Sequence, residues 1–257
     1  MARNLLSIAG YDPSGGAGVV LDLRVFEHLG FRGFGVLTAL TAQDARRVQA
    51  VYSLPSRLVR SQVRALSRGR RFSGIKVGMA GSLENLTTII RILAVHPNLP
   101  RVVDPVFRSS SGFWLIEKNA AAAFLELLKG RASLITPNLD EASALAGFPV
   151  RTVDGMQEAA GRIQARCGIP CLVKGGHLRS EAVDVLYDGD RFRTFRHARM
   201  RKDVHGTGCF LSAAILGGLA GGCRLEEACR RGIALTVRAI RKSAPAGGGR
   251  SVFAFPL

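Results

Sequence analysis

Short apolar runs alternate with longer amphipathic stretches along most of the chain. In the longer stretches apolar residues recur at helical spacing, as at Val19, Leu23, Phe26 and Leu29, and again within residues 119–130. The short runs predict strands at residues 5–10, 33–40, 74–79, 101–106, 133–138 and 170–176. Strands that alternate with helices favour right-handed crossovers. The pattern therefore predicts an α/β fold with a mostly parallel sheet covered by helices on both faces.

One segment departs from this alternation. Residues 184–195 hold two short runs on either side of Asp188 and Gly189, a pair typical of tight hairpin turns. This segment predicts an antiparallel hairpin. The chain shows no long linker, low-complexity tract or internal repeat, so we expect a single domain over residues 1–257.

The composition is that of a globular protein. Hydrophobic residues make up 47% of the 257 residues and charged residues 21%, which is enough to bury a sizeable core. No run reaches the roughly 18 apolar residues of a membrane span. The first ten residues lack the longer apolar segment of a signal peptide. We therefore expect a cytoplasmic protein with no membrane partner.

The formal net charge of +17 suggests anionic partners, with nucleic acid as one candidate. The densest basic clusters, residues 67–72 and 196–202, are not interleaved with aromatic side chains that stack on bases. This pattern favours a solvated basic surface over a nucleic-acid site, although it leaves the latter open.

The five cysteines are scattered and form no C-x-x-C pair, so the pattern gives little support to a zinc or redox site. We interpret Cys167, Cys223 and Cys229 as small buried side chains. Only Cys209 lies in a sequence context that suggests chemistry.

Three polar residues each follow an apolar predicted strand. They are Asp104, Asn138 and Lys174. Ligands of open parallel sheets bind beyond the carboxyl ends of the strands. Singly, each residue would be interpreted as a loop residue or a cap, but together they predict a shared site.

Two glycine-rich elements offer backbone N–H groups to that site. The first, "YDPSGGAG" at 11–18, follows the first predicted strand and leads into a helix. In it Asp12 either contacts a ligand or caps the turn, and Asp22, further along the helix, is expected on a solvated face. The second, "HGTGC" at 205–209, precedes a helix and puts Cys209 in the first turn.

The start of a helix suits phosphate binding because free N–H groups and the helix dipole favour an anion. The alternative for "HGTGC" is an ordinary tight turn into a core helix. Neither G-x-x-x-x-G-K-[ST] nor G-x-G-x-x-G occurs in the chain. A nucleotide would therefore need a different cradle.

Eight motifs follow one another in order along nearly the whole chain: "IAGYDPSGGAG" (8–18), "VLTALTAQD" (36–44), "IKVGMAGS" (75–82), "VVDPV" (102–106), "LITPNLDEASALAG" (134–147), "LVKGGH" (172–177), "DVLYDG" (184–189) and "HGTGC" (205–209). In these motifs the chain resembles the hydroxymethylpyrimidine/phosphomethylpyrimidine kinases of thiamin biosynthesis, in the ribokinase-like superfamily. The resemblance implies a three-layer αβα sandwich.

The resemblance implies an activity and a substrate pocket. These kinases transfer the γ-phosphoryl group of ATP to 4-amino-5-hydroxymethyl-2-methylpyrimidine, and then phosphorylate the monophosphate to the diphosphate. An amide such as that of Gln43 suits an aminopyrimidine edge because it both donates and accepts hydrogen bonds. The residues matched to the pyrimidine pocket are Gly10, Asp12, Gly15, Gly16, Ala17, Gln43 and Met79.

The resemblance also implies ATP and Mg²⁺ as cofactors. Asn138 and Glu141 match the family's N-x-x-E, which holds Mg²⁺ directly or through water, with Asp104 beside them. The residues matched to the nucleotide are Asp104, Asn138, Lys174 and Thr207.

Four residues are matched to the catalytic part of the site, where the phosphoryl group is transferred: Gly206, Gly208, Cys209 and Lys174. Lys174 would neutralise charge on the transferring group. A helix N-terminus lowers the pKa of a thiol, so we expect a thiolate at Cys209 that accepts the substrate hydroxyl proton.

Several positions depart from the family pattern. Ser110 stands in place of a lysine, Phe113 in place of an aspartate and Phe210 in place of a common threonine, while Tyr11 replaces a small residue. We expect these changes to crowd the phosphate-facing region and to affect the second phosphorylation and the choice of substrate. Arg108 is a candidate to replace the missing lysine charge.

Two other functions remain open. One is a pyridoxal-type kinase, since a pyridine with a hydroxymethyl group presents a similar target. The other is a binding or regulatory homologue that has lost catalysis, which the departures and the basic charge motivate. The resemblance further suggests a homodimer.

Overall fold

A nine-stranded sheet forms the centre of the computed structural model, in the order β3-β2-β1-β4-β5-β6-β7-β8-β9. Six strands are parallel: β1 (Asn4–Tyr11), β2 (Arg32–Gln43), β4 (Phe72–Val77), β5 (Arg101–Val103), β6 (Leu134–Ile135) and β7 (Cys171–Lys174). Three strands at the two edges are antiparallel to their neighbours: β3 (Val48–Ser53), β8 (Ala182–Tyr187) and β9 (Phe192–His197). The structure describes residues 3–44, 47–109, 112–117, 120–176, 178, 182–200, 202–246 and 250–256.

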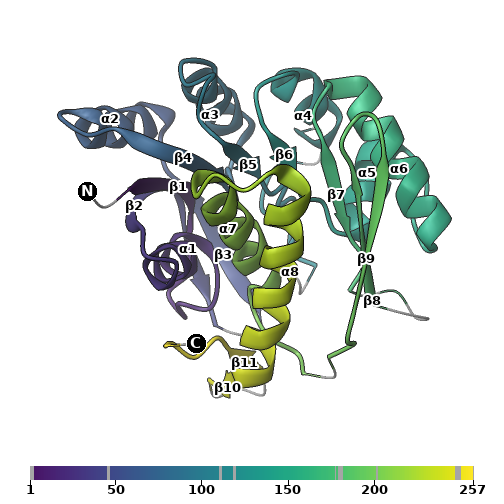
Figure 1. Cartoon of the computed structure of the whole chain (residues 1–257). Helices are drawn as coiled ribbons and strands as arrows, with labels where there is room; N and C mark the ends of the chain where they lie inside the picture. Colours follow the sequence, from purple (N-terminus) through teal and green to yellow (C-terminus); the bar gives the residue numbers. More distant parts are fainter. Residues whose placement is uncertain are drawn as a thin grey trace.

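Helices cover both faces of this sheet and give three layers (Figure 1). One face carries α1 (Gly18–His28), α7 (Thr207–Ala220) and α8 (Leu225–Lys242). The other carries α2 (Ser56–Ser67), α3 (Leu83–Ala94), α4 (Ala120–Leu128), α5 (Leu139–Ala146) and α6 (Val153–Cys167). A separate two-stranded sheet pairs β10 (Ala244–Pro245) with β11 (Ser251–Val252). The predicted αβα sandwich with a mostly parallel sheet is confirmed.

The predicted strands all appear, although several are shorter than their apolar runs. The predicted antiparallel hairpin is confirmed as β8 and β9, which pair from Ala182 with His197 to Tyr187 with Phe192. The apolar pattern did not predict β3. Its residues 48–53 do not alternate cleanly, because β3 is an edge strand that pairs with β2 alone.

The burial pattern explains why α7 is apolar on all sides. It packs between the sheet and α8, and it also contacts α1. Such a helix needs no polar face, since none of its middle turns meets water. Its first turn emerges at the carboxyl ends of the parallel strands, the edge where open sheets bind ligands.

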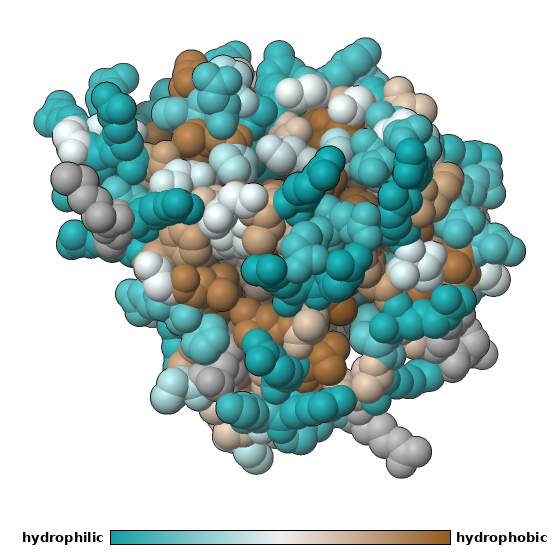
Figure 2. All heavy atoms as spheres, in the orientation of Figure 1, coloured by the Kyte–Doolittle hydropathy of each residue, from teal (hydrophilic) through white to brown (hydrophobic). Residues whose placement is uncertain are grey.

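Hydrophilic side chains cover much of the face that carries α8, with hydrophobic residues between them (Figure 2). Within the described part of the chain, no helix combines the length and the apolar character that crossing a membrane requires.

Candidate active site

The strand-end residues converge as predicted. Asp104 follows β5 and Lys174 ends β7, and the Lys174 ammonium lies 2.6 Å from Oδ1 of Asp104. The Thr136 hydroxyl donates to the same oxygen at 3.0 Å. Asn138 forms a parallel bridge with Lys174. These four residues, which follow or end three consecutive strands, therefore form one polar cluster, here called the strand-end cluster.

Asn138 and Glu141 begin α5 with a reciprocal cap. The side-chain oxygen of Asn138 accepts the Glu141 N–H at 2.9 Å, and Oε2 of Glu141 accepts the Asn138 N–H at 2.8 Å. Burial raises the pKa of Glu141 to about 8, although the Lys174 charge works against the rise. The N-x-x-E spacing thus has a structural role in this chain. The reciprocal cap holds the side chains of Asn138 and Glu141 beside Lys174.

The two glycine-rich elements, from opposite ends of the chain, touch each other. Gly206 has φ +83°, and a Cβ on it would lie 2.0 Å from the carbonyl oxygen of Gly16. A Cβ on Gly208 would lie 3.0 Å from Nζ of Lys174 and 3.5 Å from Oδ2 of Asp104. The start of α7 therefore lies against both the first glycine loop and the strand-end cluster.

Four of the residues matched to a pyrimidine pocket meet in pairs around the first loop. A Cβ on Gly10 would lie 2.9 Å from the sulfur of Met79, and the side chain of Gln43 hydrogen-bonds to Asp12. Beside Met79, Ala39 and Leu115 form a small apolar cluster. The arrangement combines an apolar wall with an amide and a carboxylate.

His205, which the sequence analysis did not single out, connects the two loops. Its Nε2 lies 2.8 Å from Oδ2 of Asp12, while the Ser14 N–H and hydroxyl donate to Oδ1. Burial works to raise the pKa of Asp12, but hydrogen bonds from His205, Gln43 and Ser14 lower it overall. The turn-capping interpretation of Asp12 is confirmed, and Asp12 also contacts His205. The position of His205 directly before Gly206 in the sequence was the signal that could have identified it.

Cys209 stands in the first turn of α7, as predicted, but its expected thiolate is not found. Burial raises the pKa of the thiol to about 11, and Asp22 and Asp104 add to the rise. Lys76 and the Gly18 N–H act in the opposite direction. Desolvation therefore outweighs the helix N-terminus, and Cys209 is a thiol at neutral pH.

Asp22 does not lie on a solvated face. It is fully buried, and Nζ of Lys76, also fully buried, lies 2.9 Å from each of its carboxylate oxygens. The sequence contained a signal for this, since Asp22 lies three residues after Val19 and four before Phe26 on the apolar face of α1.

Phe210 does not crowd the phosphate-facing region, contrary to the expectation. Its side chain is fully buried under the C-terminal segment, with its ring centroid 4.5 Å from that of Phe253. The residue after Cys209 faces the core because the helix turns it away from the site. The phenylalanine at position 210 therefore adds an aromatic contact in the core and does not change the active site.

Phe210→Thr should destabilise the protein by about 3 kcal/mol or more while changing substrate preference little. The smaller side chain leaves a cavity against Phe253 and buries a hydroxyl. Urea unfolding measures the loss, and kinetics on two substrates test specificity. A stable variant with an altered substrate preference would contradict this placement of Phe210.

The other departures lie on the loop after β5. The Arg108 guanidinium lies 3.9 Å from the centroid of the Trp114 ring, and the two residues form an antiparallel bridge. In this structure the Arg108 charge stacks on an aromatic ring. Phe113 is partly exposed on the same loop, and Ser110 lies outside the described residues.

A groove of about 460 Å³ runs between β9 and α8. The groove lies two strands away from Lys174. Lys174 pairs with Asp184, and Asp184 pairs with Phe195 in the groove, so about 10 Å separates Lys174 from Phe195. Hydrogen bonding to Asp184 raises the pKa of His197, which lines the groove. The lining residues are Thr194, Phe195, Arg196, His197, Arg230, Ile233, Ala234 and Val237.

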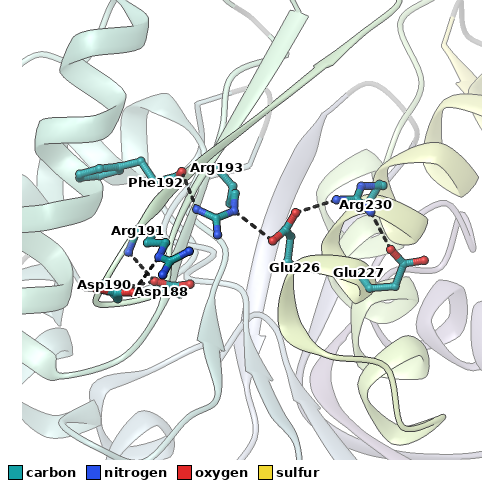
Figure 3. A network of polar contacts seen from close by, with 8 residues as sticks. All are labelled: Asp188, Asp190, Arg191, Phe192, Arg193, Glu226, Glu227 and Arg230. Carbon is teal, nitrogen blue, oxygen red and sulfur yellow. Dashed lines mark hydrogen bonds and ion pairs between the residues drawn. The ribbon is translucent and has the colours of Figure 1, made fainter.

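A charged network supports the groove (Figure 3). Glu226 at the start of α8 accepts from Arg193 of β9 at 3.0 Å and from Arg230 at 2.6 Å. Arg230 also donates to Glu227 at 2.9 Å. The network fixes the hairpin to the helix and holds the Arg230 guanidinium in place.

Comparisons with known proteins point to one family. A family model described as phosphomethylpyrimidine kinase matches residues 12–253. A hydroxymethylpyrimidine/phosphomethylpyrimidine kinase of Streptomyces coelicolor is 38% identical over 246 residues, which cover 95% of this chain and 91% of that protein.

Two solved structures are similar over nearly their full length. The phosphomethylpyrimidine kinase of Clostridium difficile is 34% identical with a TM-score of 0.81, and the match covers 93% of this chain and 99% of that one. An ADP complex of Bacillus subtilis pyridoxal kinase is 31% identical with a TM-score of 0.89, covering 98% and 97%.

Proposed function

The chain belongs to the phosphomethylpyrimidine kinase family and is a phosphotransferase, and we propose that it phosphorylates 4-amino-5-hydroxymethyl-2-methylpyrimidine and then its monophosphate with ATP. The observation that carries the proposal is the contact between the two glycine loops, where Gly206 meets Gly16. This contact brings a pocket suited to an aminopyrimidine next to a helix start suited to a phosphoryl group.

The pyrimidine is held by the first loop. Gln43 presents an amide to the ring edge, and Met79 supplies an apolar surface beneath the ring. Asp12, held by His205 and Ser14, keeps the loop closed against the second loop. The hydroxymethyl group then points toward the start of α7.

The transfer itself depends on charge and position. The N–H groups of residues 206–209 point at the transferring phosphoryl group, and Lys174 adds a positive charge from the strand-end cluster. Burial would lower the pKa of Lys174, but Asp104 and Glu141 outweigh burial and raise it. Lys174 is therefore charged throughout the working pH range.

The strand-end cluster also has the donor chemistry for Mg²⁺. Asp104 and Glu141 supply carboxylate oxygens and Asn138 an amide oxygen, the donor types that Mg²⁺ prefers. Among the described residues, no three His, Cys, Asp or Glu side chains group as a complete metal cage. Mg²⁺ keeps several waters, and here it would neutralise phosphate charge. Asn138, Glu141 and Asp104 would hold it, and Thr207, at the start of α7, would lie beside the phosphates.

The groove between β9 and α8 is the proposed site of the nucleotide base. It lies on the same face of the sheet as α7, about 10 Å from Lys174, a distance that a ribose and a phosphate chain can span. Its volume lies within the range of small-molecule sites.

Ala234→Trp should fill this groove and raise the KM for ATP roughly tenfold, or about 1.4 kcal/mol, with little change in the KM for the pyrimidine. Ala65→Trp on the exposed face of α2 is the matched control, since it adds the same side chain away from the groove. Steady-state kinetics on both variants check this. Equal KM values for ATP in the two variants would place the base elsewhere.

We further propose that the protein is a homodimer, which the family resemblance supports, and that its basic surface is mainly solvated rather than a nucleic-acid site. Asp104, Asn138, Glu141, Lys174 and Cys209 are all present in the site, which argues against a homologue that has lost catalysis. Salt-sensitive nucleic-acid binding without any ATP turnover would favour that alternative.

Pyridoxal is the nearest competing substrate, since solved pyridoxal kinases share the fold. The test is the ratio of kcat/KM for the hydroxymethylpyrimidine to that for pyridoxal under the same Mg-ATP conditions. We expect the ratio to favour the pyrimidine. A strong preference for pyridoxal would replace the proposed substrate while leaving the transfer chemistry unchanged.

A further inference from the structure

A buried charged cluster lies beneath the active site and has no part in the function proposed above. Lys76 of β4, Asp22 of α1 and Ser7 of β1 are all fully buried. Both oxygens of Asp22 lie 2.9 Å from Nζ of Lys76, and Oδ2 also accepts the Ser7 hydroxyl at 2.5 Å. Burial alone would lower the pKa of Lys76, but Asp22 outweighs it and the pKa is raised.

The position of the cluster connects it to both loops. A Cβ on Gly78 would lie 2.9 Å from Nζ of Lys76, so the ammonium group reaches the backbone next to Met79. Asp22 lies one helical turn after Gly18, whose N–H donates to the sulfur of Cys209. The charged pair therefore lies between the floor of the pyrimidine pocket and the start of α7.

Stability alone does not account for a buried pair of this kind. Removing two charges from water costs several kcal/mol per ion, and well-packed apolar side chains of similar volume are often equally stable or more stable. The surrounding cores consist of apolar side chains that would accommodate such a replacement. A role in the neighbouring site gives a reason for the charges.

We propose that Lys76 is a positioning residue for phosphoryl transfer, held by Asp22 so that its ammonium group favours movement of the substrate hydroxyl proton to the sulfur of Cys209. This inference rests on the proposed function. Cys209 is a thiol at rest, so it first loses its proton to solvent, and the Lys76 charge favours the thiolate that results. In the step, the proton leaves the hydroxymethyl oxygen for this thiolate while that oxygen bonds to the γ-phosphorus. The bond from phosphorus to the β,γ-bridging oxygen breaks, and ADP leaves with its electron pair.

The charges around Cys209 have opposite effects on the pKa of its thiol, and substitutions can distinguish these effects. Lys76 favours the thiolate, whereas burial, Asp22 and Asp104 favour the thiol. Lys174 also lies within electrostatic range of the sulfur. Removing the Asp22 charge should therefore increase the thiolate fraction, and removing both Asp22 and Lys76 should decrease it. Opposite changes show that the pair sets the charge at the sulfur, and the kcat of the double variant shows whether that charge serves the transfer.

The first test replaces the pair by apolar residues, in the double variant Lys76→Met with Asp22→Leu. We expect a folded protein whose kcat falls at least about tenfold, while its affinity for the pyrimidine stays within about twofold. Arg101→Met is the matched control, because Arg101 is a buried cation at the opposite end of the sheet, hydrogen-bonded to the carbonyls of Leu93 and Pro97. Its kcat should be unchanged. A folded double variant with the kcat of the parent would overturn the proposal.

The second test needs no substrate and so separates this inference from the proposed function. Iodoacetamide alkylation of Cys209 is followed by mass spectrometry between pH 7 and 9 in a Cys223→Ser background, which removes the other partly exposed thiol. Asp22→Asn should alkylate at least about threefold faster than the parent, and the double variant more slowly. Asp22→Asn keeps the shape of the pair, so this readout remains if the double variant fails to fold. An equal or slower rate in Asp22→Asn, or no labelling of Cys209 in any variant, would overturn the proposal.

Discussion

Gly206→Ala is expected to remove nearly all phosphoryl transfer. The residue adopts φ +83°, a conformation that disfavours any side chain, and its Cβ would lie 2.0 Å from the Gly16 carbonyl oxygen and 2.8 Å from Leu21. The two glycine loops must move apart to accept the methyl group. Because a displacement of about 1 Å at a reacting centre can cost about 10²-fold in rate, kcat should fall at least that far.

Gly222→Ala provides the control for this variant. Gly222 follows the other end of α7 and has φ +93°, but no atom lies within 4 Å of the position of its Cβ. It therefore carries the same backbone strain, about 1–2 kcal/mol of stability, without separating the loops. Single-turnover transfer measured on both proteins should show the loss in Gly206→Ala alone. Equal losses would attribute the effect to helix strain rather than to the loop contact.

Lys174→Gln should lower kcat by about 10²–10³-fold. The Lys174 ammonium lies 2.6 Å from Asp104 and next to Gly208, where we propose that negative charge develops during transfer. Removing it takes away that stabilisation and leaves Asp104 unpaired. The KM for the pyrimidine should change little, since the side chains proposed to hold the ring are Gln43 and Met79 rather than Lys174.

Two companion variants separate charge from folding. Lys174→Gln combined with Asp104→Asn removes the unpaired carboxylate, so it should recover stability in thermal unfolding without recovering kcat. Lys129→Gln changes an exposed lysine at the end of α4 and should leave kcat unchanged. A double variant with the parent kcat would exclude Lys174 from the transfer step.

Much of the fold was predictable because strands and helices differ in the spacing of their apolar residues. The parallel sheet followed from that alternation, and the convergence of Asp104, Asn138 and Lys174 followed from the carboxyl ends of parallel strands. The edge strand β3 was missed because pairing with one neighbour requires no regular apolar pattern. The direction of Phe210 also depended on the register of α7, which the local sequence does not give.

The electrostatics of the site were harder to predict, because they depend on residues far apart in the sequence. A helix N-terminus lowers the pKa of a thiol, yet burial raises that of Cys209 to about 11. How deeply a side chain is buried is a property of the packed structure. Likewise, the spacing along α1 indicates that Asp22 is buried, but its partner Lys76 lies 54 positions later and could not be predicted from α1 alone.

A crystal structure with the hydroxymethylpyrimidine and a non-hydrolysable ATP analogue would show whether the two glycine loops hold the substrate and the phosphates side by side. We expect the pyrimidine against Gln43 and Met79, the base of the nucleotide in the groove between β9 and α8, and the γ-phosphate at the N–H groups of residues 206–209. The hydroxymethyl oxygen should then lie between Cys209 and that phosphate. A pyrimidine bound away from the first loop, or a γ-phosphate away from the start of α7, would contradict the account.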